Sequence, residues 1–264
     1  MMDVARVERE VAGVEPETPA GRYAVNMWKH ALAMLQAPTA ADGSGAVPYL
    51  PAETDTWTQE LTHKHRLLDV GCLGGHGLFD LAARRQTAGL DIPQLFGIDT
   101  EWESIRIAQH MAANHAWDCE PPAFAVASVE ALPFADGYFD FVIARLVIPY
   151  VDIHKALAEI ARVTRPHGYV LVQLHAPAYY RHQVWHNKHN LRRVLYYLRP
   201  ILASAFLQIS RRQWRGRYFG ETALTAKQFT AHALRHGLVV ERVFGDARRP
   251  MVGCGKRFTT KAWS

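Results

Sequence analysis

A short stretch of the chain, HRLLDVGCLGGHGLFDLAARR (residues 65–85), combines an acid with a cluster of glycines. Asp69 lies near the end of a short apolar run, and glycines follow at positions 71, 74, 75 and 77. Glycine adopts backbone conformations denied to other residues and allows close approach of a ligand. The order of apolar run, glycine turn and amphipathic segment predicts a ligand-binding turn between a strand and a helix.

A nicotinamide dinucleotide is one ligand that such a turn can hold. The fingerprint for that ligand is G-x-G-x-x-G. Counted from Gly71, the second and third glycine positions are occupied by Leu73 and His76. The sequence therefore does not match the dinucleotide fingerprint.

The elements that must position this turn alternate along the chain. Apolar runs predict strands at 65–71, 94–99, 123–128, 138–147 and 168–175, and helices are expected over 75–86, 102–115 and 152–164. This alternation indicates a parallel sheet covered by helices on both sides. A late helix at 225–237 precedes two strands, 238–245 and 251–258, whose short link favours antiparallel pairing. A further helix is predicted over 22–36, with an apolar stripe formed by Tyr23, Met27, Ala31, Met34 and Leu35.

Three further motifs follow the glycine turn in order. They are LFGID, ending in Asp99, then ASVEALPFADGYFDFVIARLVIPYV, then EIARVTRPHGYVLV. With the glycine turn, they resemble the class I S-adenosylmethionine (SAM)-dependent methyltransferases, of methyltransferase type 11, over roughly residues 60–175. The resemblance implies a Rossmann-like α/β fold: a mostly parallel seven-stranded sheet with helices on both faces, an antiparallel last strand, and a helical insertion after the fifth strand.

The resemblance also implies SAM as the cofactor, S-adenosylhomocysteine as the product, and a set of cofactor-binding residues. Asp99 would accept the ribose hydroxyls, although the same residue could instead cap the helix that follows. Leu73 replaces the second family glycine, so either the turn is shifted onto Gly74, which we expect, or cofactor affinity is reduced. The full set implied for the cofactor is Asp69, Gly71, Cys72, Leu73, Gly74, Gly75, Asp99, Thr100, Ser128, Val129, Arg145 and Leu146.

The segment 176–220 does not fit the alternation of strands and helices. It holds nine Lys and Arg residues and no Asp or Glu, so it carries +9 in a chain of net charge +5. Three interpretations stay open: a helical cap that binds a small, aromatic or anionic acceptor, a face that grips RNA, or an element that lies on an anionic membrane surface. The cap interpretation is preferred, with Tyr179, Tyr180, Trp185 and Arg192 expected to bind the acceptor.

Histidines in and before this segment are candidates for a catalytic base, because imidazole titrates near neutral pH. The candidates are His175, at the end of the fifth expected strand, with His182 and His186, spaced for one helix face. We expect no metal site, since Cys, Asp and Glu ligands are missing from the segment.

The whole sequence predicts an enzyme that methylates a small acceptor. Alternatives are an RNA methyltransferase and a binding or scaffold protein that has lost activity through Leu73. We expect residues 1–57 to form a lid and residues 58–264 to form the methyltransferase domain. The three cysteines are scattered, and no apolar stretch is long enough to span a membrane, so a cytoplasmic location is expected, with a homodimer possible.

Overall fold

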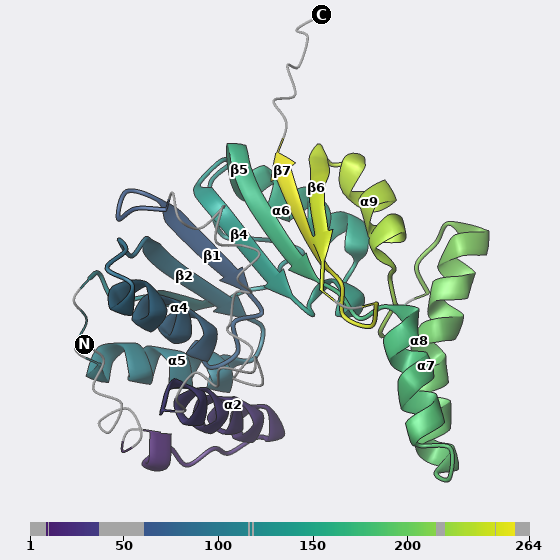
Figure 1. Cartoon of the computed structure of the whole chain (residues 1–264), viewed down its shortest axis with the longest axis horizontal. Helices are drawn as coiled ribbons and strands as arrows, with labels where there is room; N and C mark the ends of the chain where they lie inside the picture. The colour runs from purple at the N-terminus through teal and green to yellow at the C-terminus, as the bar shows by residue number, and fades with distance from the viewer. Residues whose placement is uncertain are drawn as a thin grey trace, which may run out of the picture. The chain divides into compact units, whose positions relative to one another are not determined.

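The computed structural model describes residues 9, 11–36, 61–115, 117, 119–214, 220–245 and 247–256. The chain divides into two compact units, Met1–Ser128 and Val129–Ser264. Residues 1–8, 10 and 37–57 of the lid expected at 1–57 lie outside the described residues, as do Arg215 and Arg217 of the basic segment. Seven strands form one sheet in the order β3-β2-β1-β4-β5-β7-β6, which confirms the predicted fold class (Figure 1).

Unit 1 contains the three parallel strands at one end of this order. They are β1 (Arg66–Val70), β2 (Gln94–Asp99) and β3 (Ala123–Val126), and the helices between them are α4 (His76–Thr87) and α5 (Trp102–Asn114). The register pairs Asp69 with Gly97 and Asp99 with Val126. Four of the five β1 residues are buried, as expected of a central parallel strand.

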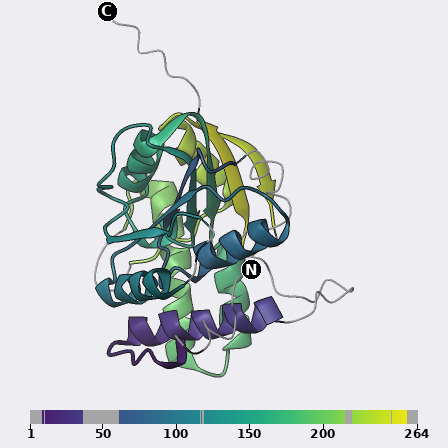
Figure 2. The same ribbon diagram turned by 90° about the vertical axis from the view of Figure 1, so that its left-hand side faces the viewer.

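The N-terminal helix α2 (Pro19–Gln36) packs beside α5 in unit 1 (Figures 1 and 2). Its start is held by the buried carboxylate of Glu103 in α5, which accepts hydrogen bonds from the backbone N–H and the hydroxyl of Thr18. Partnering this carboxylate matters, because an unpaired buried charge is strongly destabilising.

The face of α2 that is buried differs from the predicted stripe. Ala24, Val25 and Trp28 are buried, whereas Tyr23 is exposed and Met27 is only half-buried. The prediction was wrong at Tyr23 and passed over Trp28, whereas the side chains of Ala31, Met34 and Leu35 lie outside the described residues. Trp28 packs edge-on against Phe79 of α4, with ring centroids 4.5 Å apart.

Unit 2 contains the other four strands. They are β4 (Phe139–Arg145), β5 (Thr164–Gln173), β6 (Leu238–Phe244) and β7 (Met251–Lys256). β4 and β5 are parallel, and β7 runs antiparallel to both β5 and β6, as the short link predicts. A 3-10 turn η2 (Ile148–Tyr150) and helix α6 (Ile153–Val163) connect β4 to β5. The expected apolar face of α6 is buried, and Asp152 caps its start.

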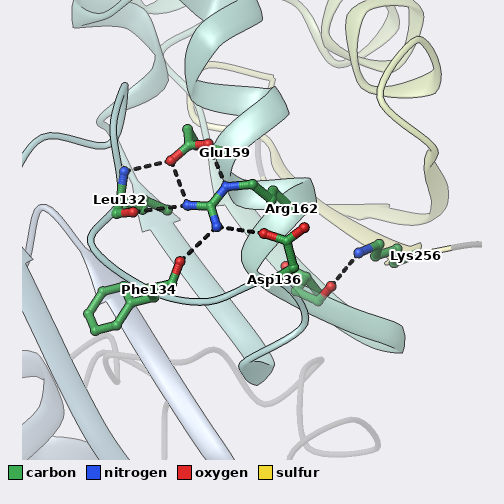
Figure 3. Close-up of polar contacts among 7 residues, drawn as sticks. Leu132, Phe134, Asp136, Glu159, Arg162 and Lys256 are labelled. Carbon is green, nitrogen blue, oxygen red and sulfur yellow. Dashed lines mark hydrogen bonds and ion pairs between the residues drawn. The ribbon is translucent and has the colours of Figure 1, made fainter.

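The loop that precedes β4 is held by one arginine, Arg162 of α6 (Figure 3). Its guanidinium donates to the carbonyls of Leu132 and Phe134 at 2.9 and 2.7 Å, and it pairs with Asp136 at 2.8 Å and Glu159 at 2.7 Å. Glu159 in turn accepts the N–H of Leu132 at 2.6 Å. The LPF motif therefore has a structural role, because its backbone N–H and carbonyl groups are hydrogen-bonded to the Arg162–Glu159 ion pair.

The basic segment is helical. It forms α7 (Pro177–His186) and α8 (Leu191–Ser210), which pack against each other, and α9 (Ala226–Leu234) follows with a Thr225–Gln228 capping box. In Figure 1 the two helices stand beside the strands of unit 2 as a hairpin. Among the described helices, none has both the length and the apolar character needed to cross a membrane.

Candidate functional site

The glycine turn between β1 and α4 has left-handed backbone at three positions. Gly71, Leu73 and Gly75 all have positive φ angles, 74°, 50° and 80°. The N–H groups of Gly71 and Cys72 donate to the carbonyl of Ile98 in β2 at 2.8 and 3.0 Å. The left-handed conformation therefore falls on Leu73 itself, and the expected shift onto Gly74 is not observed.

Asp99 stabilises this conformation from the end of β2. Its Oδ2 accepts the N–H of Leu73 at 2.9 Å, and its Oδ1 accepts the N–H of Glu101 at 3.1 Å, next to the start of α5. Each carboxylate oxygen has two lone pairs, so both can still accept a hydroxyl. Asp99 is half-buried. The residue thus joins the turn to the helix start and keeps the capacity to bind a ribose diol.

The other side of the turn rests on side chains that the sequence did not indicate. The indole Nε1 of Trp28 donates to the carbonyl of Gly74 at 2.7 Å, and a Cβ added at Gly74 would lie 3.1 Å from that nitrogen. A Cβ added at Gly75 would lie 2.7 Å from the ring of Phe124. Packing therefore favours glycine at both positions, and the positive φ of Gly75 is a second reason for glycine there. A tryptophan in the N-terminal helix was the one available signal.

The remaining cofactor candidates of unit 1 differ in their exposure. Burial, with Asp69 and Asp99 nearby, raises the pKa of the Cys72 thiol well above its usual value, so Cys72 stays neutral and fills space. Asp69 is buried, Ser128 is half-buried and Thr100 is exposed. Helix α4 begins without a side-chain cap, and helix N-termini of this kind are ready sites for anionic groups. A carboxylate acceptor and an open helix start on one glycine turn fit the ribose and amino-acid parts of SAM.

The cofactor candidates of unit 2 lie at the end of β4. Arg145 Nε donates to Gln173 Oε1 in β5 at 3.1 Å, and the N–H of Leu146 donates to the Gln173 carbonyl at 2.9 Å. Leu146 has a φ of 59°, a conformation that leucine adopts only when its surroundings impose it. Val129 is buried. Strained backbone is concentrated at functional sites, so the conformation of Leu146 makes the end of β4 a candidate part of a functional site.

His175, after the end of β5, lies in a polar cluster that we call the His175 cluster, made of Tyr150, His175, Tyr179, Tyr180 and Glu221. The rings of His175 and Tyr179 stack at 4.1 Å with an interplanar angle of 3°. Nδ1 of His175 faces Oε1 of Glu221 at 3.7 Å, longer than a hydrogen bond but within ion-pair range. The hydroxyl of buried Tyr180 donates to the same carboxylate.

Glu221 is ionised in this cluster. Burial alone would raise its pKa, but interactions with His175, Tyr180 and Tyr150 outweigh burial and lower the pKa below its ordinary value. Burial and the nearby carboxylate raise the pKa of Tyr180, so its hydroxyl remains a donor. The sequence prediction missed Glu221, although one signal exists: it is the first acid after Glu159.

The structure separates the predicted residues of the basic segment into two groups. His175, Tyr179 and Tyr180 come together, whereas His182, His186, Trp185 and Arg192 are exposed on α7 and α8. The His182 and His186 rings stack on each other at 6.0 Å, and Trp185 packs beneath Lys188 at 4.8 Å. No described contact joins these four residues to the His175 cluster.

Comparison with known proteins gives a family match over the central part of the chain. A family model described as a methyltransferase domain matches residues 68–172. An uncharacterized methyltransferase of Bacillus subtilis, YcgJ, is 30% identical over 122 residues, which are 46% of this chain and 45% of the relative. A malonyl-[acyl-carrier protein] O-methyltransferase of Erwinia pyrifoliae is 34% identical over 110 residues, 40% of this chain and 36% of that protein. The matches thus span less than half of these relatives.

Solved structures support the fold over a longer part of the chain. A SAM-dependent methyltransferase from Methanosarcina mazei superposes with a TM-score of 0.55 at 21% identity, covering 80% of this chain and 99% of that one. A putative methyltransferase of Haloferax volcanii, solved with its Trm112 activator, gives a TM-score of 0.57 at 16% identity, covering 93% of this chain and 100% of that one. With the glycine turn and Asp99, these findings identify residues 68–172 as a class I methyltransferase domain whose cofactor is S-adenosylmethionine.

Proposed function

We propose that this protein transfers the methyl group of SAM to a small aromatic acceptor that must lose a proton, such as a phenol or an aromatic amine. The observation that carries the proposal is the His175 cluster, in which a histidine is stacked on tyrosine and faces an ionised carboxylate. Ligands of open α/β sheets bind outside the carboxyl ends of the strands, and His175 follows the end of β5.

In this proposal, different residues bind the cofactor, bind the acceptor and remove its proton. SAM supplies an electrophilic methyl group on a sulfonium, so the protein has to bind, orient and deprotonate. Asp99 and the turn 71–75 would hold the ribose and the amino-acid part of the cofactor. Tyr179 offers its ring for stacking against a planar acceptor. With Nδ1 directed at Glu221, His175 would accept the acceptor's proton on Nε2 and Glu221 would act as a positioning residue.

The ionised Glu221 also favours a neutral acceptor over an anionic one. A carboxylate acceptor, as the printed name of the Erwinia relative implies for that protein, is already ionised at neutral pH and needs no base. A histidine paired with a carboxylate is useful for a group whose pKa lies higher, such as a phenol near 10. We therefore place the acceptor among protic aromatic compounds.

The cofactor part of the proposal is tested by calorimetric titration with SAM and S-adenosylhomocysteine. We expect micromolar binding to the wild type and at least about tenfold weaker binding to Asp99→Asn, because bonds to a charged acceptor contribute about 1.5–3 kcal/mol. Asp91→Asn is the matched control, since Asp91 precedes the other end of β2 and its carboxylate pairs with exposed His63 at 3.0 Å. Absence of binding to folded wild-type protein would favour the scaffold alternative.

The acceptor part is tested by formation of S-adenosylhomocysteine with a panel of phenols, aromatic amines and carboxylic acids. For an accepted phenol, we expect His175→Gln to lower kcat by about a hundredfold or more. Glu221→Gln should lower kcat by a smaller factor with little change in KM, as for a residue that orients the base. Loss of activity in His182→Gln or His186→Gln instead would move the base to α7 and contradict the proposal.

A further inference from the structure

Helix α8 carries a continuous apolar face that no described element covers. Six side chains, which we call the α8 stripe, follow one another at steps of three or four residues and so share one side of the helix: Leu191, Leu195, Leu198, Leu202, Phe206 and Ile209. Leu198 is half-exposed and the other five are exposed, with Ile209 at 87% and Leu202 at 54% relative accessibility. Isolated exposed leucines are ordinary, but a row along a whole helix marks an interaction surface.

The stripe is not left over from the packing of α8 within unit 2. The opposite side of the helix supplies that packing with Pro200, Ala203, Ser204 and Leu207, all buried. The carbonyl of Pro200 accepts the N–H of Ala223 at 3.5 Å, which ties this buried side to the chain before α9. A helix that buries only these four side chains on one side and exposes a row of large apolar ones on the other is oriented for a contact outside the unit.

The charge around the stripe indicates what the contact is. Exposed arginine pairs stand at both ends of the helix, Arg192–Arg193 at its start and Arg211–Arg212 just beyond its end. No acid occurs between Glu159 and Glu221, and the carboxylate of Glu221 is engaged in the His175 cluster. A second copy of the same surface would bring arginine pairs against arginine pairs. RNA would use the arginines but would leave the aliphatic side chains exposed.

We propose that the α8 stripe is a membrane-docking surface that lies in the headgroup region of an anionic lipid bilayer. Apolar side chains on one face with arginines beside them are the properties of helices that bind at this depth. The leucines, Phe206 and Ile209 enter the acyl boundary, and the arginine pairs contact lipid phosphates. Trp214, whose ring lies 5.1 Å from that of Phe206, extends the apolar surface beyond the end of the helix.

The test is co-sedimentation of the full chain with vesicles, without cofactor or acceptor, so that its result is independent of the proposed function. Phosphatidylcholine vesicles with a minor fraction of phosphatidylglycerol are compared with phosphatidylcholine alone. We expect binding to the anionic vesicles that weakens as salt rises, since salt screens the arginine–phosphate attraction. Leu202→Gln should weaken this binding about tenfold, because it removes one inserted side chain without changing the charge.

Leu234→Gln is the matched control, because Leu234 has 53% relative accessibility and lies on α9 outside the stripe. We expect it to bind as the wild type does, and far-UV circular dichroism checks that both variants are folded. Three results would overturn the proposal: no binding of the wild type to anionic vesicles at low salt, equal weakening in both variants, or a wild-type dimer without vesicle binding that Leu202→Gln converts to monomer. The last would assign the stripe to a second copy.

Discussion

Leu73 occupies a backbone conformation that usually belongs to glycine. Its φ of 50° is sustained by the bond from its N–H to Asp99, at 2.9 Å. A non-glycine residue in the left-handed region costs roughly 1–3 kcal/mol. The residue is therefore tolerated because Asp99 holds it, and the acid expected to bind the ribose also stabilises the turn.

Replacement of Leu73 separates the backbone effect from the side-chain effect. We expect the free energy of unfolding of Leu73→Gly to be about 1 kcal/mol higher than that of Leu73→Ala, because only glycine adopts the positive φ without strain. Chemical denaturation measures this difference. Calorimetry with SAM then compares both variants with wild type: tighter binding in both would show that the leucine side chain limits affinity. Equal stability of the two variants would contradict the assignment of strain to residue 73.

At the scale of elements, the loop before β4 depends on one side chain of α6. Arg162 bonds to two backbone carbonyls and two carboxylates, and these interactions raise its pKa above the usual arginine value. Lysine at this position would keep the charge but could not reach both carbonyls with the same planar fork. We expect Arg162→Lys to lower the free energy of unfolding by about 1–3 kcal/mol, the cost of partly buried acceptors left unsatisfied.

Arg84→Lys is the control for this prediction. Arg84 forms an i,i+4 pair with Asp80 at 2.9 Å on the partly exposed side of α4, and such pairs contribute at most about 1 kcal/mol. Denaturation curves for the two variants should therefore differ clearly. An equal, small effect of both would mean that the carbonyls of Leu132 and Phe134 find other donors.

At the scale of the whole molecule, a histidine cluster makes stability depend on pH. His154 of α6 lies 3.3 Å from both His232 and His236, at the end of α9 and just beyond it. Burial, with His154, Arg235 and His236 nearby, lowers the pKa of His232 to about 4. Between this value and the ordinary histidine value near 6.5, the unfolded chain binds a proton that the folded chain does not.

The contribution of neutral His232 to the free energy of unfolding should therefore be fully present above pH 6.5 and should decrease as the pH is lowered toward 4. Thermal unfolding across this range measures the slope, and His232→Gln should make it shallower. His189→Gln, which removes an exposed histidine of the α7–α8 link, should leave the slope as it is. A wild-type profile that is flat between pH 4 and 6.5 would contradict the neutral state of His232.

Much of this fold could be predicted from the sequence, because the local periodicity of apolar residues indicates strands and helices. The alternation after residue 65, the apolar face of α6 and the antiparallel β6–β7 pair were all predicted and confirmed. Glu221 was not predicted, since it acts on His175 from 46 positions away and no local pattern links them. The buried face of α2 was misassigned for a similar reason: only the tertiary contacts of Trp28, with Phe79 and Gly74, select it.

The indole of Trp28 is buried and bonded to the carbonyl of Gly74, at the turn expected to close around the cofactor. Its fluorescence should therefore be blue-shifted and should respond to any movement of that carbonyl. The difference in emission between wild type and Trp28→Phe isolates this signal from those of the other six tryptophans of the chain. The protein thus carries an intrinsic optical reporter of its own glycine turn, suitable for stopped-flow observation of cofactor binding without any attached dye.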